Sequence, residues 1–428
     1  MREKPLKRVF LVLPPAHKYL CVNSYTIRSY SYSIHSVLKS GGYAVSCMDF
    51  LDDSAGFEKF CENLSHRHGG PSIYIIVIFF SNRIGSLRLI KAAKGNDACK
   101  NRVVVSGPFS TINYDAILRK YPVDVVVLQE PENTMVELMK GFMTDGDIGK
   151  IGNIAYRDKK GICRTFQRIK SGPDALPFTS IDFYKKKLSP IPVWTYRGCP
   201  FACTFCDRRF MYGDKIRARS VETVIKELTV LNKRHGVKNV VFDDCNFILN
   251  KKRALELCRA IQRQGLKISW TCATRVGCVD AEVLRAMKSA GCKTIYYGIE
   301  SGSNAVLRRI GKTFSRNQCI GVVKMSKLLG MRVGLFLMVG CPGETKETIR
   351  QTKKFLLDLY PFDELNVNPL VVLPGTSLFD GLLKKGSISK DYFFKEKEPL
   401  FYRTDWSDIK REIKPFLKFL EICPTELI

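Results

Sequence analysis

The segment RGCPFACTFCD, residues 197–207, places three cysteines within eight residues, at Cys199, Cys203 and Cys206. It directly follows an apolar stretch that is typical of a strand, and it precedes a helical pattern. Thiolates bind soft metals such as zinc and the irons of iron–sulfur clusters. A structural zinc site would ordinarily need a fourth cysteine or histidine at matching spacing, and none follows. Three thiols on one loop fit a 4Fe–4S cluster that keeps one iron open to chelate a small molecule.

Strand and helix patterns alternate around this segment. Amphipathic patterns such as 221–234, 252–264 and 345–359 separate apolar stretches. This alternation predicts a parallel sheet, because parallel pairing needs a crossover connection that is usually a helix. Six repeats predict a curved, partly closed sheet with its chemistry at the carboxyl ends of the strands. The expected strands are 193–196, 239–243, 269–273, 294–299, 331–338 and 364–370.

The first 140 or so residues show a second alternation, of Val- and Ile-rich stretches with helical patterns. This predicts a doubly wound parallel sheet of the Rossmann type, whose ligand would sit beyond the carboxyl ends of the strands. The expected strands are 8–13, 44–49, 72–80, 102–106 and 123–128. The expected ligand-facing loops are 14–18, 81–85, 106–111 and 129–134.

We therefore expect an α/β protein with four consecutive parts. Residues 1–146 form a Rossmann-like, flavodoxin-like domain, and residues 147–190 form a linker that contains a β-hairpin. Residues 191–385 form a partial (β/α)6 barrel of the TIM type. Residues 386–428 form a short basic and aromatic extension, with a helix expected at 406–420.

Length and composition exclude several classes of protein. The chain has 428 residues, 45% of them hydrophobic and 26% charged, which is ordinary globular usage and excludes a disordered polymer. The longest apolar runs, such as 73–80 and 333–339, fall short of the ~20 residues that a membrane span needs. The apolar stretch near the start is too short for a signal peptide, and the 16 cysteines favour reduced thiols. We expect a cytoplasmic protein with no membrane span.

The chain is strongly basic. Lysine and arginine number 69 against 41 aspartates and glutamates, a net charge of +28 that attracts polyanions and acidic partners. The basic residues occur in scattered short clusters without a recognisable nucleic-acid-binding motif. A solvated basic surface is therefore favoured over a nucleic-acid site.

The Cys-x3-Cys-x2-Cys spacing after a strand resembles the cluster motif of the radical S-adenosylmethionine (SAM) enzymes. In that family the open iron binds the amino and carboxylate groups of SAM. Further segments resemble the family's strand-end motifs in the family's order, notably YYGIESGS at 296–303, FLMVGCPGET at 336–345 and LPGT at 373–376. Each segment alone also has a structural reading as a turn, a capping acid or a surface charge. Their order at successive strand ends favours the resemblance.

The resemblance implies roles for individual residues. Glu300 and Ser301 would hold ribose or methionine polar groups of SAM, and Arg275 would meet a carboxylate. The full set implied to bind SAM is Phe205, Asp243, Arg275, Glu300, Ser301, Gly302, Gly340 and Pro374, and the cluster ligands implied are Cys199, Cys203 and Cys206. Neither the residues nor the resemblance assigns a catalytic side chain.

The front domain is similar to the cobalamin-binding domain of the B12-dependent subclass of radical SAM enzymes. This likeness implies cobalamin at Ser81, Ser106, Gly107 and Pro108. The Asp-x-His-x2-Gly motif that supplies a cobalt-ligating histidine in some relatives is absent. His17 follows the first strand and could reach cobalt, although an isolated loop histidine is more often plain surface. The loop at 129–134 carries Gln and Pro where relatives usually carry glycines.

The leading functional hypothesis is an oxygen-sensitive radical SAM enzyme that generates a 5′-deoxyadenosyl radical and, with cobalamin, methylates an unreactive carbon. The alternatives are a radical cyclisation or rearrangement resembling that of the anaerobic Mg-protoporphyrin ester cyclase, RNA methylthiolation, and a non-catalytic electron-transfer or iron-sensing protein. The expected partners are a small-molecule, lipid or peptide substrate and a reductant such as flavodoxin or ferredoxin.

Overall fold

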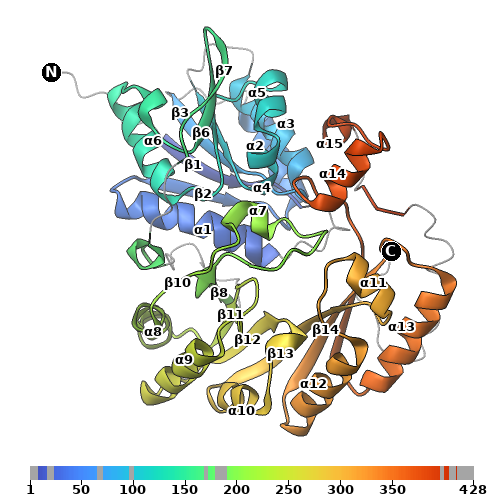
Figure 1. Ribbon diagram of the computed structural model, residues 1–428. Helices are drawn as coiled ribbons and strands as arrows, with labels where there is room; N and C mark the ends of the chain where they lie inside the picture. The colour runs from blue at the N-terminus through green and yellow to red at the C-terminus, as the bar shows by residue number, and fades with distance from the viewer. Residues whose placement is uncertain are drawn as a thin grey trace. The chain divides into compact units, whose positions relative to one another are not determined.

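The computed structural model describes residues 8–16, 24–64, 71–95, 101–167, 172–178, 190–395, 400–403 and 411. The chain forms two compact units, each with its own sheet (Figure 1). Unit 1 comprises Met1–Lys185 with Phe210–Tyr212, and unit 2 comprises Lys186–Arg209 with Gly213–Ile428. The predicted His17 and almost all of the predicted helix at 406–420 lie outside the described residues.

Unit 1 contains a seven-stranded sheet in the order β2-β1-β3-β4-β5-β6-β7. Its first five strands are parallel, as the alternation predicts. They are β1 (Arg8–Leu13), β2 (Val45–Asp49), β3 (Ser72–Val77), β4 (Arg102–Ser106) and β5 (Val125–Val127). The central strands β3, β4 and β5 are buried along nearly their whole length, because helices cover the sheet on both faces (Figure 1). The helices are α1 (Ser24–Ser40), α2 (Ser54–Leu64), α3 (Arg83–Lys94), α4 (Pro108–Ile112), α5 (Tyr114–Lys120) and α6 (Glu132–Thr144).

The hairpin expected in the linker forms, and it belongs to the sheet of unit 1. β6 (Ile154–Asp158) pairs antiparallel with β5, and β7 (Gly161–Arg164) pairs antiparallel with β6. Ile154 and Ala155 are fully buried in the core of this unit. The physical reason is that β5 would otherwise be an edge strand with unpaired backbone groups, which the hairpin satisfies. This part of the predicted linker is therefore a component of the first unit.

Unit 2 contains a six-stranded, wholly parallel sheet in the order β15-β14-β13-β12-β11-β8. This order, with helical crossovers, confirms the predicted fold class. The strands are β8 (Ile191–Val193), β11 (Asn239–Phe242), β12 (Ser269–Thr274), β13 (Cys292–Glu300), β14 (Arg332–Val339) and β15 (Glu364–Pro369). A separate short ladder pairs β9 (Tyr196–Arg197) with β10 (Arg217–Ala218). α7 (Arg208–Tyr212) lies between those two strands in sequence.

Along the outside of the sheet, α8 (Val221–Thr229) packs on α9 (Lys251–Arg263), and α9 packs on α10 (Ala281–Ser289) (Figure 1). In turn α10 packs on α12 (Arg316–Leu328), and α12 packs on α13 (Lys346–Leu359). The other helices of unit 2 are α11 (Asn304–Arg309), α14 (Ser377–Lys384) and α15 (Tyr392–Lys395). Six helices of unit 2 begin at a residue whose side chain accepts a backbone N–H of the first turn, which satisfies an otherwise unpaired donor. These caps are Ser220, Asn250, Asp280, Ser315, Thr345 and Thr376.

Among the described residues, no helix combines the length and the apolar composition that crossing a membrane requires.

Candidate cluster and cofactor site

The three cysteines lie on one loop, residues 198–207, which follows β8 and β9 at the carboxyl edge of the sheet. This segment is called the thiol loop. The loop is held by backbone hydrogen bonds on two sides. Cys199 donates its N–H to Gly213, and Thr204 donates to Ile310 while its carbonyl accepts from Leu378. Gly213, Ile310 and Leu378 of unit 2 thus secure one short segment, which fixes the thiols at the strand ends.

Two glycines make this packing possible. Gly198 has φ +95°, and a Cβ there would lie 2.1 Å from the carbonyl oxygen of Lys215. A Cβ on Gly311 would lie 2.6 Å from the carbonyl oxygen of Ala202, inside the thiol loop. Both positions need glycine because no side chain fits where the two backbones meet.

The thiols are half-buried. Burial raises the pKa of the Cys199 and Cys206 thiols, and for Cys199 the positive charges of Arg275 and Lys312 act in the opposite direction. Within the described ranges, no three His, Cys, Asp or Glu side chains converge as ligands of a metal ion. Three thiol donors on one loop, with cations beside them, are nevertheless the soft, anionic ligand set that an iron–sulfur cluster requires.

Arg275, which follows β12, contacts this loop directly. Its Nη1 donates to the Sγ of Cys203 at 3.4 Å, and its guanidinium lies 3.8 Å from the ring centroid of Phe201. Nη2 donates to the Oγ1 of Thr313 at 3.1 Å. Only 8% of Arg275 is exposed, so these contacts act in a poorly hydrated environment. The structure therefore brings one predicted site residue onto one of the predicted cluster ligands.

Glu300, at the end of β13, forms a buried ion pair. Lys312 Nζ lies 2.9 Å from Glu300 Oε1, and their side chains are 6% and 10% exposed, respectively. The same ammonium lies 5.7 Å from the ring centroid of Phe205. Glu300 has φ +58°, an uncommon conformation for a residue with a side chain. Lys312 thus links two predicted SAM-binding residues, Phe205 and Glu300, that are distant in sequence.

The residues after Glu300 serve the packing of β13. A Cβ on Gly302 would lie 2.5 Å from Thr352 Cα and 2.7 Å from Phe355 Cβ, so glycine allows the strand end to approach α13. The Ser301 side chain accepts the N–H of Ser303. These contacts do not involve the thiol loop, and the SAM-binding roles of Ser301 and Gly302 stay predictions.

The loop after β14 is held by a buried carboxylate. Gly340 has φ +80° and donates its N–H to Glu344 Oε2 at 2.5 Å. Burial raises the pKa of Glu344 to about 7. Arg403 donates to the Glu344 carbonyl at 2.8 Å, so the C-terminal region also anchors this loop. Gly340 is therefore placed by a residue of its own motif.

The last two predicted SAM-binding positions lie at neighbouring strand ends. Asp243 follows β11 and pairs with Arg208, with 3.8 Å between Oδ1 and Nη2. Pro374 lies buried in the turn before α14, and the first turn of that helix contacts the thiol loop through Leu378. Both residues are thus at the carboxyl edge of the sheet, where the prediction puts them.

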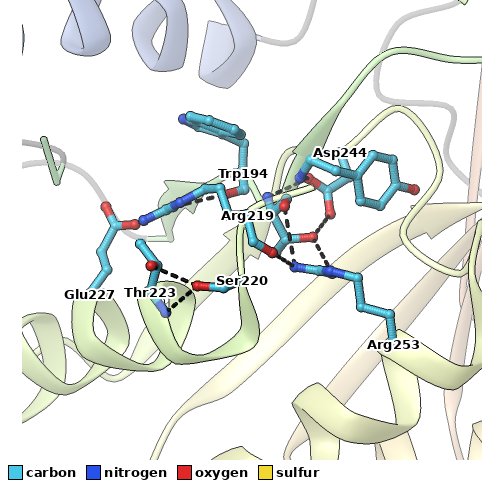
Figure 2. Close-up of polar contacts among 9 residues, drawn as sticks. Trp194, Arg219, Ser220, Thr223, Glu227, Asp244 and Arg253 are labelled. Atoms are coloured by element: carbon cyan, nitrogen blue, oxygen red, sulfur yellow. Dashed lines mark hydrogen bonds and ion pairs between the residues drawn. The ribbon is translucent and has the colours of Figure 1, made fainter. Parts of the chain in front are cut away.

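Sequence reasoning missed several side chains of this site. Lys312, Thr313 and Phe201 were not identified, although the glycine before Lys312 marks a turn close to the Glu300 motif. Asp244 was also missed as a support of the thiol loop. Its carboxylate accepts the N–H and Oγ1–H of Thr195, both at 2.6 Å (Figure 2). Burial raises the pKa of Asp244 to about 6.

The predicted cobalamin residues of unit 1 gather at the carboxyl ends of β3 and β4. Gly107 has φ +111°, and a Cβ there would lie 2.5 Å from the carbonyl oxygen of Ile78. Ser106 Oγ lies 2.8 Å from the hydroxyl of Tyr30. The Ser81 hydroxyl is buried without a hydrogen-bond partner among the described residues. Pro108 is the first residue of α4. A buried, unsatisfied hydroxyl after β3 and a side-chain-free turn after β4 fit an edge of the sheet that receives a polar ligand.

A three-thiol loop at the carboxyl ends of six parallel strands defines a class of cluster-carrying (β/α) barrels. Residues 194–356 match the model of the Radical SAM superfamily. A match to that superfamily implies a 4Fe–4S cluster and SAM as cofactors.

Known relatives and one solved structure agree with this placement. An uncharacterized methyltransferase of Pyrococcus horikoshii is 36% identical over 286 residues, which are 65% of this chain and 62% of the relative. The anaerobic magnesium-protoporphyrin IX monomethyl ester cyclase of Cereibacter sphaeroides is 27% identical over 363 residues, which are 81% of this chain and 58% of the cyclase. The chain thus spans less than two thirds of the length of either relative.

The radical SAM methyltransferase TsrM of Kitasatospora setae, solved with cobalamin and a 4Fe–4S cluster, superposes with a TM-score of 0.71 at 15% sequence identity. The match covers 89% of this chain and 75% of TsrM. It shows that this chain shares the fold of that structure, which confirms the predicted fold class.

Proposed function

We propose that this chain is a radical SAM enzyme whose Cys199, Cys203 and Cys206 hold the 4Fe–4S cluster. The observation that supports this most strongly is the convergence of Arg275 and the Glu300–Lys312 pair around the loop that carries the three thiols. When bound, the cluster and SAM supply one-electron chemistry that yields a 5′-deoxyadenosyl radical. The protein orients the cofactor, directs the radical and excludes water.

The chain's own residues have distinct tasks in this proposal. Lys312 holds one oxygen of the Glu300 carboxylate and leaves the other to accept a hydrogen bond from SAM. Phe205 offers an aromatic face beside that pair. The backbone turns at Gly340 and Pro374 lie at the ends of the neighbouring strands and would flank the adenine. Asp243 and Ser301 would contribute further polar contacts.

Cobalamin is the proposed second cofactor, at Ser81, Ser106, Gly107 and Pro108. The unsatisfied hydroxyl of Ser81, the side-chain-free turn at Gly107 and the fold shared with TsrM support it. When bound, cobalamin would supply a methyl group for an unreactive substrate carbon. We therefore propose C-methylation of a small-molecule, lipid or peptide substrate, with electrons from a reductant such as flavodoxin or ferredoxin.

Radical cyclisation is the second candidate. It is favoured by the match to the magnesium-protoporphyrin ester cyclase, which extends over 81% of this chain. Product analysis separates the two, because methylation adds a methyl group to the substrate, whereas cyclisation closes a ring without one.

The test of the primary proposal is anaerobic reconstitution followed by SAM cleavage. The wild-type chain should bind about four irons and release 5′-deoxyadenosine on reduction. Cys203→Ala should lose both, whereas Cys163→Ala, which changes a half-exposed cysteine in unit 1, should keep both. A full cluster without SAM cleavage in the wild type would contradict the enzyme assignment.

Cobalamin binding needs a separate experiment. After incubation with hydroxocobalamin and desalting, the wild type should retain about one corrinoid molecule per chain, as measured by its absorbance. Complete loss of the corrinoid on desalting would refute the second cofactor and leave the radical SAM proposal intact.

A further inference from the structure

We propose that Arg275 raises the reduction potential of the cluster through its hydrogen bond to the sulfur of Cys203. This inference rests on the proposed function, because it takes Cys203 as a cluster ligand. It replaces the expectation that Arg275 meets the carboxylate of SAM.

The guanidinium of Arg275 is held by independent contacts. Phe201 supports its face at 3.8 Å, and Thr313 accepts from Nη2 at 3.1 Å. The backbone N–H of Arg275 donates to Asn246 Oδ1 at 3.2 Å, which fixes the main chain from which the side chain extends. With face, edge and backbone anchored, Nη1 is directed at Cys203 Sγ, 3.4 Å away.

The same contacts weaken the case for SAM recognition. An arginine grips a carboxylate best with two parallel N–H groups of its planar fork. In Arg275 the two terminal nitrogens already serve different acceptors, a thiol and a hydroxyl. Lys312 is a second cation near the loop, because its ammonium lies in the same site beside Phe205 and Glu300.

A hydrogen bond to a ligand sulfur has a defined effect on an iron–sulfur cluster. It withdraws electron density from the sulfur and, together with a nearby positive charge, stabilises the reduced cluster. The effect is larger here because Arg275 is 92% buried, so water screens the charge poorly. The cluster should therefore be easier to reduce in the wild type than in a chain without this donor.

The experiment is a redox titration of the reconstituted full-length protein without SAM. Electron paramagnetic resonance measures the fraction of reduced cluster at each potential. Arg275→Gln removes the charge and should lower the midpoint potential of the cluster. At a fixed potential the ratio of reduced to oxidised cluster should fall about tenfold, which corresponds to about 59 mV for one electron. Arg275→Lys keeps the charge but not the planar fork and should give a smaller decrease. Thr313→Val removes one anchor of the guanidinium and should also lower the midpoint partly.

Arg332→Gln is the matched control, because Arg332 is an exposed arginine at the opposite, amino end of β14. Its midpoint should equal that of the wild type. Arg275→Gln with a full cluster, an unchanged midpoint and weaker SAM binding would overturn the proposal in favour of SAM recognition. If Arg275→Gln assembles no cluster, Thr313→Val decides, and an unchanged midpoint there would refute the proposal. A wild type that binds no cluster would instead defeat the proposed function itself.

Discussion

Glu344 shows how a single buried carboxylate can shape the pH dependence of stability. It organises the loop after β14 by accepting the N–H of Gly340, and burial raises its pKa to about 7. An acid whose pKa is higher in the folded than in the unfolded state stabilises the fold at low pH, and this contribution is lost as the pH rises through the folded value.

We predict that the free energy of unfolding of the wild type, relative to Glu344→Gln, falls by about 1–3 kcal/mol as the pH rises from about 4.5 to 7.5. Denaturant unfolding at several pH values measures it. Glu347→Gln, which changes an exposed glutamate in the following helix, should follow the wild type. If the free energy of unfolding of the wild type, relative to Glu344→Gln, rises with pH, the pKa of Glu344 is not raised by folding.

Gly107 is a second residue whose role can be isolated by substitution. Gly107→Ala should destabilise the chain by about 1–3 kcal/mol more than Gly161→Ala and weaken cobalamin retention. Both glycines have positive φ, but only at Gly107 does a Cβ meet backbone, 2.5 Å from Ile78, whereas Gly161 faces open space. Thermal unfolding of the two variants gives the comparison. Equal losses would show that backbone strain alone, without the close approach, accounts for the effect.

At the scale of elements, a buried polar network ties α8 and α9 to the strand that leads into the thiol loop (Figure 2). Arg219 pairs with Glu227 of α8 at 2.5 Å, with side chains 3% and 2% exposed, and donates to the Trp194 carbonyl. Arg253 of α9 donates to the carbonyls of Thr195 and Arg219. The network joins two helices to the segment directly upstream of Cys199.

Removing one partner of such a pair leaves a buried charge without compensation. We predict that Glu227→Ala lowers the free energy of unfolding by about 3–5 kcal/mol and reduces the iron bound after reconstitution. Glu222→Ala, at an exposed position on the same helix, should cost less than about 1 kcal/mol. Denaturant titration and iron analysis test both variants. A Glu227→Ala chain as stable as the wild type would show that the ion pair does not hold α8 to the strand.

At the scale of the whole molecule, the net charge of +28 favours acidic partners over neutral ones. If an acidic electron carrier such as flavodoxin reduces the cluster, its rate should fall at least about tenfold between low salt and 0.5 M salt. Stopped-flow reduction at several ionic strengths measures this. A reduced viologen, which is cationic, should not slow with salt. A carrier rate independent of salt would contradict electrostatic steering.

The same charge raises the alternative of RNA methylthiolation. Filter binding of RNA at two salt concentrations separates specific recognition from general attraction to phosphate, because phosphate contacts alone weaken steeply with salt.

Local patterns were sufficient to predict much of this protein. The alternation of apolar strands and amphipathic helices indicated two parallel sheets, because burial and backbone pairing act within each element. The cysteine spacing indicated the cluster loop, since three ligands within eight residues need no distant partner. The N-caps of six barrel helices likewise depend on neighbours in sequence.

Only the tertiary structure decided which distant side chains meet. The pairing of Lys312 with Glu300, the contact of Arg275 with Cys203 and the addition of the predicted linker hairpin to β5 join residues by packing of the chain. The partner of a side chain depends on where its helix or strand packs. The chain contains many lysines, arginines and cysteines in similar sequence surroundings, so local sequence does not tell which of them meet. Periodicity therefore determines the elements, whereas the folded chain alone determines their contacts.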